Sequence, residues 1–251
     1  MTSPDMRRFD AWATTQAFRR KVETAKRELD RTASLRCVVA VSFGKDSAAL
    51  AHLAHSERGP IEMMHMRVAH ALPGGERVEA FMQTLGTLHV LDPLNSLEGS
   101  IAWLRQVGLP HERTKQAHQK IIKERKRDRG DEWAQARGFQ CTILGMRAEE
   151  SRTRRILFRS RGLTYERGNG LMMSNPIGRW SAQDVWAYHV AHSIPWHPLY
   201  DCETLGFTRE RLRSGGWLYT DGAAEGWTSW LRRHFPEQYR HLVAAFPRMA
   251  E

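Results

Sequence analysis

The sequence holds little cysteine and no CxxC pair, and this scarcity excludes several classes of protein. Its 251 residues include three cysteines, at positions 37, 141 and 202. Three thiols cannot form the dense disulfide framework of a small secreted domain. Zinc ribbons and most iron–sulfur sites need closely spaced cysteines, so we expect neither zinc nor an iron–sulfur cluster as a cofactor.

Long apolar runs are also missing. No segment approaches the roughly 20 apolar residues that span a bilayer, and the polar start MTSPDMRRFD lacks the apolar centre of a secretory signal. Hydrophobic residues still make up 41% of the chain, which is enough for one well-buried domain. We therefore expect a soluble, cytoplasmic protein without a membrane partner.

Acidic residues are outnumbered, and the formal net charge is +10. Residues 111–130 contain eight Lys or Arg against three Asp or Glu, and residues 147–161 contain six Arg against two Glu. A solvated basic helix face is one explanation for such segments, and a surface for a polyanion is the other. Nucleic acid is the favoured polyanion, because a single bound nucleotide needs only a few of these charges.

Strand-length apolar segments alternate with helical patterns after an opening amphipathic helix over residues 8–35. The expected strands are residues 36–41, 61–68, 87–91, 140–144 and 171–177, and the expected helices between them are residues 47–55, 78–85, 97–107 and 114–136. This alternation predicts an α/β fold with a five-stranded parallel sheet flanked by helices. Aromatic-rich patterns after Pro176 predict a C-terminal helical cap. We divide the chain into an N-terminal helical segment (1–35), an α/β domain (36–177) and a C-terminal helical subdomain (178–251).

One loop carries the groups that a phosphate site needs, namely Ser42-Phe43-Gly44-Lys45-Asp46-Ser47, between the first expected strand and the next helix. Ligands of open parallel sheets bind at the carboxyl ends of the strands, where helix N-termini present unpaired N–H groups. Gly44 lets the main chain approach a phosphate, and Lys45 adds a charge. Asp46 can orient the turn or reach a phosphate-bound Mg²⁺. The segment matches neither the Walker A pattern nor GxGxxG.

The sequence SFGKDS resembles the PP-loop of N-type ATP pyrophosphatases, in the form found in the phosphoadenylylsulfate (PAPS) reductase branch. Two later segments extend the resemblance. LGMRAEES at 144–151, followed by Arg154, is similar to the element LGxRxxES of that family, and NPI at 175–177, DVW at 184–186 and PLYD at 198–201 resemble its later block. The resemblance implies an adenine nucleotide alpha hydrolase-like fold that binds ATP and splits it between the α- and β-phosphates.

The resemblance also implies roles for single residues. The expected catalytic residues are Lys45, Asp46, Arg147 and Arg154, with Asp46 reaching Mg²⁺. The expected ATP-binding residues are Ser42, Phe43, Gly44, Lys45, Asp46, Ser47, Gly145 and Arg147. Glu149 and Glu150 either pair with these arginines or help to hold Mg²⁺, and Trp180 and Trp186 either belong to the core or stack on the ligand. His189, His192 and His197 are either structural or form a metal trio. In each case we favour the first explanation.

The cysteines bear on which family member this is. The reductases, as the resemblance has it, attack with a cysteine near the C-terminus, whereas the last cysteine here is Cys202 and the chain ends in AAFPRMAE. Cys37 and Cys141 lie in expected strands, about 13 to 17 Å below the nucleotide end of the sheet. If the strand order follows the family, these strands are neighbours, and we expect a close, buried Cys37/Cys141 pair that is structural or redox-responsive. Cys202 is either a sulfur relay or an inert thiol.

We therefore expect an ATP pyrophosphatase that adenylates an oxygen of nucleic acid, above all a DNA backbone phosphate, so that sulfur can be inserted. Such a protein is similar to the ATP-pyrophosphatase component of DNA phosphorothioation systems of the Ssp or Dnd type, and works beside a cysteine desulfurase or another sulfur donor. The enzyme alternatives are a PAPS or adenylylsulfate reductase and the small subunit of ATP sulfurylase. A non-catalytic nucleotide sensor or nucleic-acid-binding adaptor is the alternative of another class. A homodimer is left open.

Overall fold

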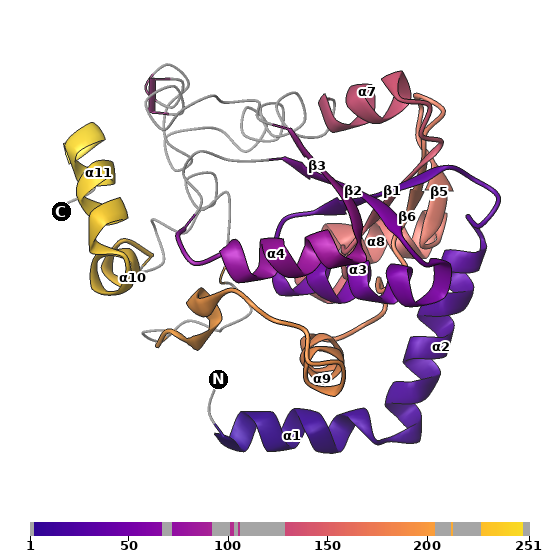
Figure 1. The fold of residues 1–251 in the computed structure, drawn as a ribbon, viewed down its shortest axis with the longest axis horizontal. Coiled ribbons are helices and arrows are strands. Elements are labelled where there is room, and N and C mark those ends of the chain that lie inside the picture. The colour runs from indigo at the N-terminus through magenta and orange to yellow at the C-terminus, as the bar shows by residue number, and fades with distance from the viewer. Residues whose placement is uncertain are drawn as a thin grey trace.

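The structure is a computed structural model that describes residues 3–66, 72–91, 101–102, 105, 129–203, 212 and 227–247. Helices surround one sheet (Figure 1). The strands are β1 (Cys37–Val41), β2 (Ile61–Met66), β3 (Gly86–Leu91), β4 (Cys141–Leu144), β5 (Thr164–Glu166) and β6 (Met172–Ser174). The helices are α1 (Ser3–Ala13), α2 (Gln16–Asp30), α3 (Lys45–Arg58), α4 (Glu76–Leu85), α7 (Arg129–Ala136), α8 (Arg152–Arg161), α9 (Ala182–Ala191), α10 (Trp227–His234) and α11 (Pro236–Ala245), with 3-10 turns η3 (Ala148–Glu150) and η4 (Pro198–Asp201).

The sheet has the strand order β3-β2-β1-β4-β6-β5. All neighbouring strands are parallel except β5, which pairs antiparallel with β6. The expected α/β fold and its five parallel strands are confirmed, but the count of five is wrong. The sixth strand, β5, is an edge strand of three residues, Thr-Tyr-Glu, which is too short and too polar to produce an alternating apolar pattern.

Side chains of β1 alternate between two layers of helices. Val39 and Val41 belong to the main hydrophobic core together with the apolar residues of α3. Val38 faces the other way and packs with Ala134 and Phe139, at and just after α7. In Figure 1, α3 and α4 lie below the sheet and α7 lies above it. The strands are therefore covered on both faces. This burial explains why their sequences are continuously apolar, as is typical of parallel sheets.

The opening segment is helical, but it forms two helices instead of the single helix expected over 8–35. The break lies at Thr15, whose side chain accepts a hydrogen bond from the amide of Phe18 at 3.2 Å and so begins α2. Asp184 of α9 then holds both helices. Its carboxylate accepts from the indole Nε1 of Trp12 at 2.8 Å and from Nζ of Lys21 at 2.5 Å.

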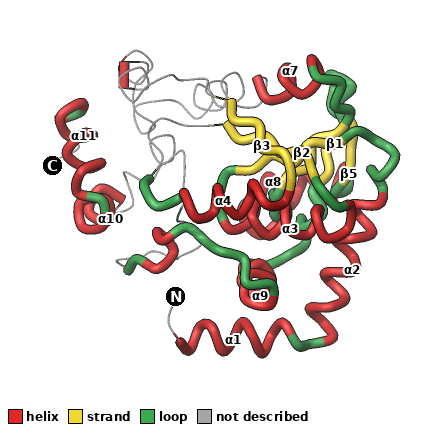
Figure 2. The backbone as a smooth tube through the Cα atoms, viewed as in Figure 1, coloured by secondary structure: helices red, strands yellow, loops and turns green. Residues whose placement is uncertain are grey.

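The aromatic-rich helix α9 forms a further layer. It contacts α3 on one side and α1 on the other, and Figure 2 shows it between these two helices, away from the sheet. Val185, Trp186, Tyr188 and His189 are buried there. Of the helix expected at 97–107, the structure describes residues 101–102 and 105, which are helical. Most of the helix expected at 114–136 lies outside the described residues, although α7 covers its end. Within the described part of the chain, no helix combines the length and apolar character needed to cross a membrane.

Candidate functional site

The Ser42–Ser47 loop and the segment after β4 meet at the carboxyl ends of two neighbouring strands. β1 and β4 are paired in register up to Ala40 and Leu144. The chain proceeds from β1 to β2 on one side, while β4 lies on the other, so the two loops lie where the strand order reverses. This is the position at which open α/β sheets bind ligands.

Hydrogen bonds within the loop hold its main chain open toward solvent. The hydroxyl of Ser47 accepts from the amide of Ser42 at 3.1 Å and donates to the carbonyl of Gly44 at 2.9 Å. Gly44 is the residue before α3 and has no side chain to satisfy the amides of the first helical turn. The start of α3, with the positive end of the helix dipole, forms a site for an oxyanion.

Phe43 adopts a conformation that its position in the sequence did not reveal. Its φ is 56°, in the left-handed region that side chains other than glycine seldom occupy. The ring stacks on His65, with the ring centroids 4.0 Å apart, and His65 Nδ1 lies 2.9 Å from the carbonyl oxygen of Val41. Phe43 is 9% exposed and its side chain points into the core, so only its main chain is available to a nucleotide.

A cavity of about 330 Å³ opens beside the loop. Among the residues predicted for the site, it is lined by Ser42, Gly44, Asp46, Ser47, Gly145 and Arg154. Glu150 and Tyr200 also line it. The sequence suggested Glu150 as an arginine partner or a Mg²⁺ ligand, and did not assign Tyr200 to the ligand. Tyr200 could have been found, since it lies within the PLYD segment that carried the resemblance.

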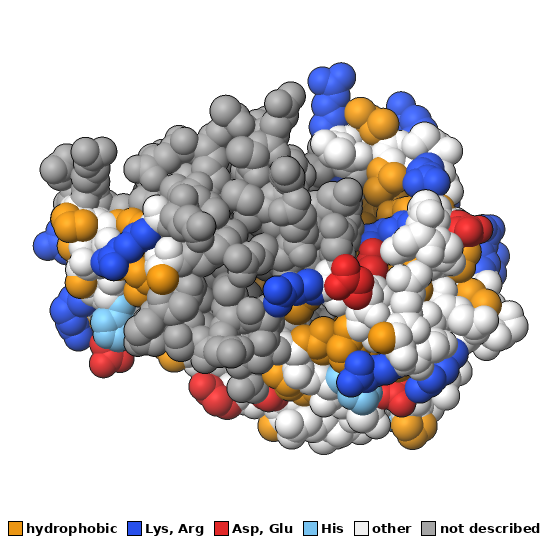
Figure 3. Space-filling view, turned by 90° about the horizontal axis from the view of Figure 1, so that it is seen from above, with side chains coloured by type: hydrophobic (Ala, Val, Ile, Leu, Met, Phe, Trp, Pro, Cys, Tyr) orange, Lys and Arg blue, Asp and Glu red, His pale blue; other side chains and the backbone are white. Residues whose placement is uncertain are grey.

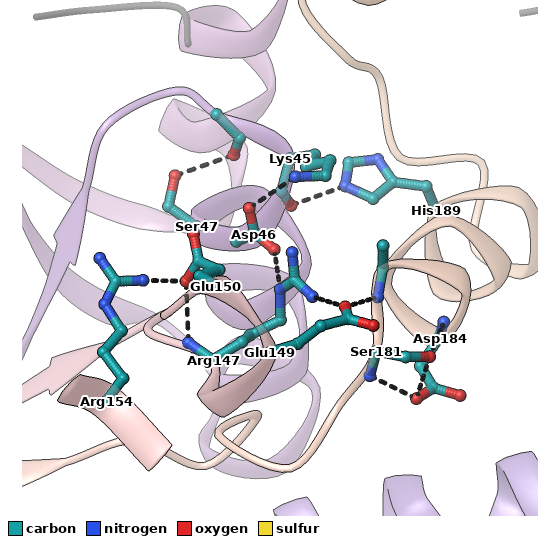
Figure 4. A network of polar contacts seen from close by, with 12 residues as sticks. Lys45, Asp46, Ser47, Arg147, Glu149, Glu150, Arg154, Ser181, Asp184 and His189 are labelled. Atoms are coloured by element: carbon teal, nitrogen blue, oxygen red, sulfur yellow. Dashed lines mark hydrogen bonds and ion pairs between the residues drawn. The ribbon is translucent and has the colours of Figure 1, made fainter. Parts of the chain in front are cut away.

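The other predicted side chains lie behind this lining in a buried network of charges (Figure 4). Lys45 and Arg147 are each 1% exposed. Asp46 accepts from Lys45 Nζ at 2.9 Å through one oxygen and from Arg147 Nε at 2.5 Å through the other. Burial raises the pKa of Asp46, but the charges of Lys45 and Arg147 outweigh that effect and hold the pKa below its ordinary value.

Two glutamates extend the network to the cavity. Arg147 donates from Nη1 to Glu149 at 2.7 Å and from its main-chain amide to Glu150 at 2.9 Å. Glu150 also accepts from Arg154 of α8. The expected pairing of both glutamates with arginine is thus observed. Arg154 is partly exposed and lines the cavity. An oxyanion in the cavity can therefore replace Glu150 as the partner of Arg154.

Lys45 is fixed from the side of the C-terminal block as well. Its amide donates to the hydroxyl of Tyr200 at 3.4 Å, and its carbonyl oxygen lies 2.7 Å from Nε2 of His189. His189 Nδ1 lies 3.1 Å from the carbonyl oxygen of Ile194. Two carbonyl acceptors favour a protonated ring, but complete burial of His189 outweighs them and lowers its pKa. The structural role expected for His189 is confirmed, and it acts on the loop itself.

The carboxylates suit a hydrated divalent cation better than a fixed metal centre. Asp46 and Glu150 both line the cavity. In the described part of the chain, no three His, Cys, Asp or Glu residues group as metal ligands. Mg²⁺ usually binds through one or two carboxylates, phosphate oxygens and water, so these two side chains fit an ion that arrives with a nucleotide.

A second cavity of about 740 Å³ adjoins the first, because Met146 lines both. Its walls come from α7, α8 and the turn between β5 and β6, and include Tyr165, Arg161 and Arg167. Arg167 pairs with Asp131.

The three cysteines all lie in the described residues and outside the lining of the 330 Å³ cavity. Cys37 and Cys141 are partners in the register of β1 and β4, at the opposite ends of these strands from the loop. Cys202 follows η4, and its Sγ contacts the carbonyl oxygen of Pro198 at 3.8 Å. Burial and the neighbouring Asp201 raise the pKa of Cys202, so its environment does not favour a thiolate.

These features agree with the comparison to known families. A family model described as the phosphoadenosine phosphosulfate reductase domain matches residues 36–217. The chain belongs to the phosphoadenosine phosphosulfate reductase family.

Curated relatives in this family match over shorter segments. An adenosine 5'-phosphosulfate reductase of Neisseria meningitidis serogroup B is 40% identical over 92 residues, which are 33% of this chain and 36% of the relative. The protein of the same name from serogroup A is 33% identical over 94 residues, covering 34% of this chain and 37% of the relative. The match therefore spans little more than a third of the length of these relatives.

Solved structures agree on the fold. The PAPS reductase of Candida auris aligns over 81% of this chain and 96% of its own, with a TM-score of 0.54 and 17% identity. An FMN adenylyltransferase of Candida glabrata, in complex with FMN and an ATP analogue, aligns over 78% of this chain and 68% of its own, with a TM-score of 0.51 and 10% identity. At these identities the likeness establishes the PP-loop type of α/β fold alone.

Proposed function

We propose that this chain binds an adenosine nucleotide in the 330 Å³ cavity and acts on the linkage that joins its α-phosphate to a second anionic group, either sulfate or pyrophosphate. The observation that carries the proposal is the cradle made by the Ser42–Ser47 loop, the start of α3 and the close main chain of Gly145. Amides and a helix N-terminus bind oxyanions irrespective of whether sulfur or phosphorus carries them.

The leading candidate substrate is a sulfonucleotide, adenosine 5'-phosphosulfate or its 3'-phosphorylated form. The names of the matched relatives support it, since those proteins are adenosine 5'-phosphosulfate reductases. In that reaction two electrons from thiols convert the sulfate group to sulfite and release AMP. In this chain, Arg154 would bind an oxyanion of the nucleotide, and the buried pair of Lys45 and Arg147 would hold Asp46 and the loop in place.

A second candidate is an ATP pyrophosphatase that adenylates an oxygen of nucleic acid, as in DNA phosphorothioation. The observation that favours it is that none of the chain's three cysteines lines the described cavity, whereas reduction of a sulfonucleotide needs a thiol there. Attack of an oxygen on the α-phosphate expels pyrophosphate and needs no thiol. Under this proposal DNA and a sulfur donor such as a cysteine desulfurase are the partners, Mg²⁺ accompanies ATP, and the protein acts in the cytoplasm.

Product analysis separates the candidates. The purified chain with Mg²⁺ receives one substrate set at a time: either sulfonucleotide with a dithiol, ATP with DNA, or ATP with sulfate. Sulfite supports reduction when it appears with AMP, or with adenosine 3',5'-bisphosphate if the 3'-phosphorylated form is supplied. DNA-dependent pyrophosphate supports adenylation, and sulfate-dependent pyrophosphate supports the ATP sulfurylase alternative. Binding without any product would leave a nucleotide sensor. Failure of all the nucleotides to bind would refute the proposal as a whole.

Two variants tie the activity to the cavity. Arg154→Ala and Lys45→Ala remove cations that neutralise the oxyanions or hold the loop, and we expect each to lower turnover by at least about 100-fold. Arg27→Ala is the matched control, because Arg27 is exposed on α2, away from the cavity. Unfolding in urea is followed in parallel, since removing Lys45 leaves Asp46 with one partner fewer in a buried network.

A further inference from the structure

Two thiols lie opposite each other at the end of the sheet away from the nucleotide cavity. Cys37 begins β1 and Cys141 begins β4, and the two are paired residues on adjacent parallel strands. Neighbouring strands are about 4.8 Å apart, which lies within the range of Cα separations that disulfides span. Both cysteines are free in the structure; Cys141 is buried and Cys37 is partly exposed.

A cation is aimed at one of these thiols. Arg58, the last residue of α3, donates from Nη1 to the sulfur of Cys37 at 3.3 Å. Its other terminal nitrogen is held by the carbonyl of Leu29 and by the hydroxyl of Thr32 at 3.0 Å. The guanidinium is thereby fixed beside the sulfur and does not depend on a flexible surface contact.

The pair is electronically unequal. The hydrogen bond from Cys141 and the charge of Arg58 lower the pKa of Cys37 to about 6, against the opposing effect of burial. The same hydrogen bond, together with burial, raises the pKa of Cys141. The sulfur of Cys37 lies 3.3 Å from each of the carbonyl oxygens of Thr32 and Leu35, either of which can accept a hydrogen bond from the protonated thiol. One sulfur is thus prepared as a nucleophile and the other as a proton donor.

We propose that Cys37 and Cys141 form a peroxide-reactive pair that closes to an intramolecular disulfide. The Cys37 thiolate attacks a hydroperoxide, which breaks the O–O bond, forms a sulfenic acid on Cys37 and releases an alkoxide or hydroxide. The thiol of Cys141 then attacks this sulfur, and the sulfenic oxygen leaves as water with the Cys141 proton. A thiol reductant restores both thiols by exchange. The reaction is independent of the proposed nucleotide chemistry.

Peptide mapping after peroxide treatment tests this assignment. The reduced chain is exposed to hydrogen peroxide in modest excess, alkylated and digested without reductant. We expect a peptide linking Cys37 to Cys141 that is lighter by two hydrogens than its parts and disappears with dithiothreitol. The Cys202→Ser variant should give the same linkage, because Cys202 follows η4 and is not part of the pair. Retention of both Cys37 and Cys141 as free thiols in the wild-type chain, while Cys202 is oxidised, would overturn the proposal.

Single variants test the order of the two steps. In Cys141→Ser, oxidation should stop at a sulfenic acid on Cys37, detected as a dimedone adduct. In Cys37→Ser, the buried Cys141 should stay reduced. Arg58→Gln should slow oxidation of Cys37 several-fold, since it removes the cation that favours the thiolate. Because variants in a buried strand can unfold, the wild-type peptide map decides the main question on its own, and a linkage from Cys202 to either strand cysteine would contradict it.

Discussion

Gly145 shows how a single missing side chain shapes the site. A Cβ built at this residue would lie 3.1 Å from the main-chain carbon and oxygen of Asp46 and 3.3 Å from the amide nitrogen of Ser47. The loop after β1 and the segment after β4 are therefore packed main chain against main chain. The neighbours of this Cβ are backbone atoms, so they cannot turn aside as a flexible side chain would.

Gly145→Ala should weaken nucleotide binding while the chain remains folded. The added methyl group pushes Asp46 and Ser47 from their positions at the start of α3, where the oxyanion cradle forms. We expect about a tenfold rise in Kd, equivalent to about 1.4 kcal/mol, in calorimetric titrations with adenosine 5'-phosphosulfate and with Mg²⁺-ATP. Gly168→Ala is the control, because nothing lies within 4 Å of a Cβ at that residue. Equal affinity in the two variants would show that the close approach of Gly145 does not position the cradle.

Single residues of the loop could be predicted from sequence, but their support could not. Serine, glycine, lysine and aspartate between a strand and a helix are enough to predict a phosphate-binding loop. The left-handed turn at Phe43 depends on its stacking on His65, which lies on another strand. The contacts that hold Lys45 come from Tyr200 and His189, 155 and 144 residues away in sequence. Contacts over such separations depend on how helices pack, which a motif does not state.

At the scale of the element, α8 separates two kinds of arginine. The helix RTRRILFRSR contains five arginines and no acidic residue. At 100° per residue, Arg152, Arg155 and Arg159 fall on one face and Arg154 on the other. The three outward arginines are exposed, and Ile156 between them is 57% exposed. None of the three forms an ion pair with a residue that the structure describes. Arg154 instead lines the 330 Å³ cavity.

This outward face is where we expect a nucleic-acid acceptor to dock, under the second candidate function. The triple variant R152Q/R155Q/R159Q should weaken binding of fluorescein-labelled DNA at least tenfold near 0.1 M salt. It should also reduce the dependence of log K on log salt concentration by up to about three counterions, measured by anisotropy across a salt series. Both effects follow from the loss of phosphate contacts.

A matched variant separates this face from the overall charge. R19Q/R20Q/R27Q removes three exposed arginines of α2 and the same net charge. Equal weakening by the two triple variants would mean that DNA responds only to the total charge of the chain. In Figure 3, basic side chains stand at several places on the described surface without merging into one patch, so the comparison is needed. The other basic segment, residues 111–128, lies outside the described residues.

The elements that sequence predicted well are those with an unbroken pattern. β1, β2 and α3 have apolar or alanine-rich segments, and their described bounds lie within three residues of those expected. β5 has three residues and no apolar alternation, so its existence follows only from the hairpin that it forms with β6. The break between α1 and α2 lies at the Thr15 cap, and Asp184 contacts both helices through Trp12 and Lys21. Helix propensity is a local property and does not predict such a tertiary contact.

At the scale of the whole molecule, one core joins the sheet to the helices on the side of α3. It extends from Phe9 and Phe18 through α3 to Trp186 and on to Trp230 and Leu242. The sequence indicated the α/β alternation, since each strand and helix has its own period. It did not indicate that α9 fills the space between α1 and α3, because a helix that is buried on two sides has no single apolar face that points to its neighbours. The division of the chain at residues 35 and 177 stays a prediction.

Buried histidines in this core make stability depend on pH. Burial lowers the pKa of His189 and of His197, and burial with neighbouring histidines lowers the pKa of His52 to about 4. In the unfolded chain these side chains bind protons near pH 6.5. Between about pH 6.5 and 4 the unfolded state therefore holds more protons than the folded state, and the free energy of unfolding falls as the pH falls. The lowered pKa values of Asp46 and Asp184 add a further loss only below about pH 4.

We therefore expect the midpoint of urea unfolding to be lower at pH 5 than at pH 7.5, measured by tryptophan fluorescence. Each histidine contributes at most about 1.4 kcal/mol per pH unit, and His52 less, because it is partly exposed. His52→Gln should lessen the drop, since glutamine keeps a polar partner for the Tyr188 hydroxyl, now 3.1 Å from His52 Nδ1, but binds no proton. His241→Gln, on an exposed part of α11, is the control and should leave the drop unchanged. A midpoint that stays constant or rises from pH 7.5 to pH 5 would mean that the buried histidines accept protons without unfolding, and that the carbonyl oxygens around His189 outweigh the effect of its burial.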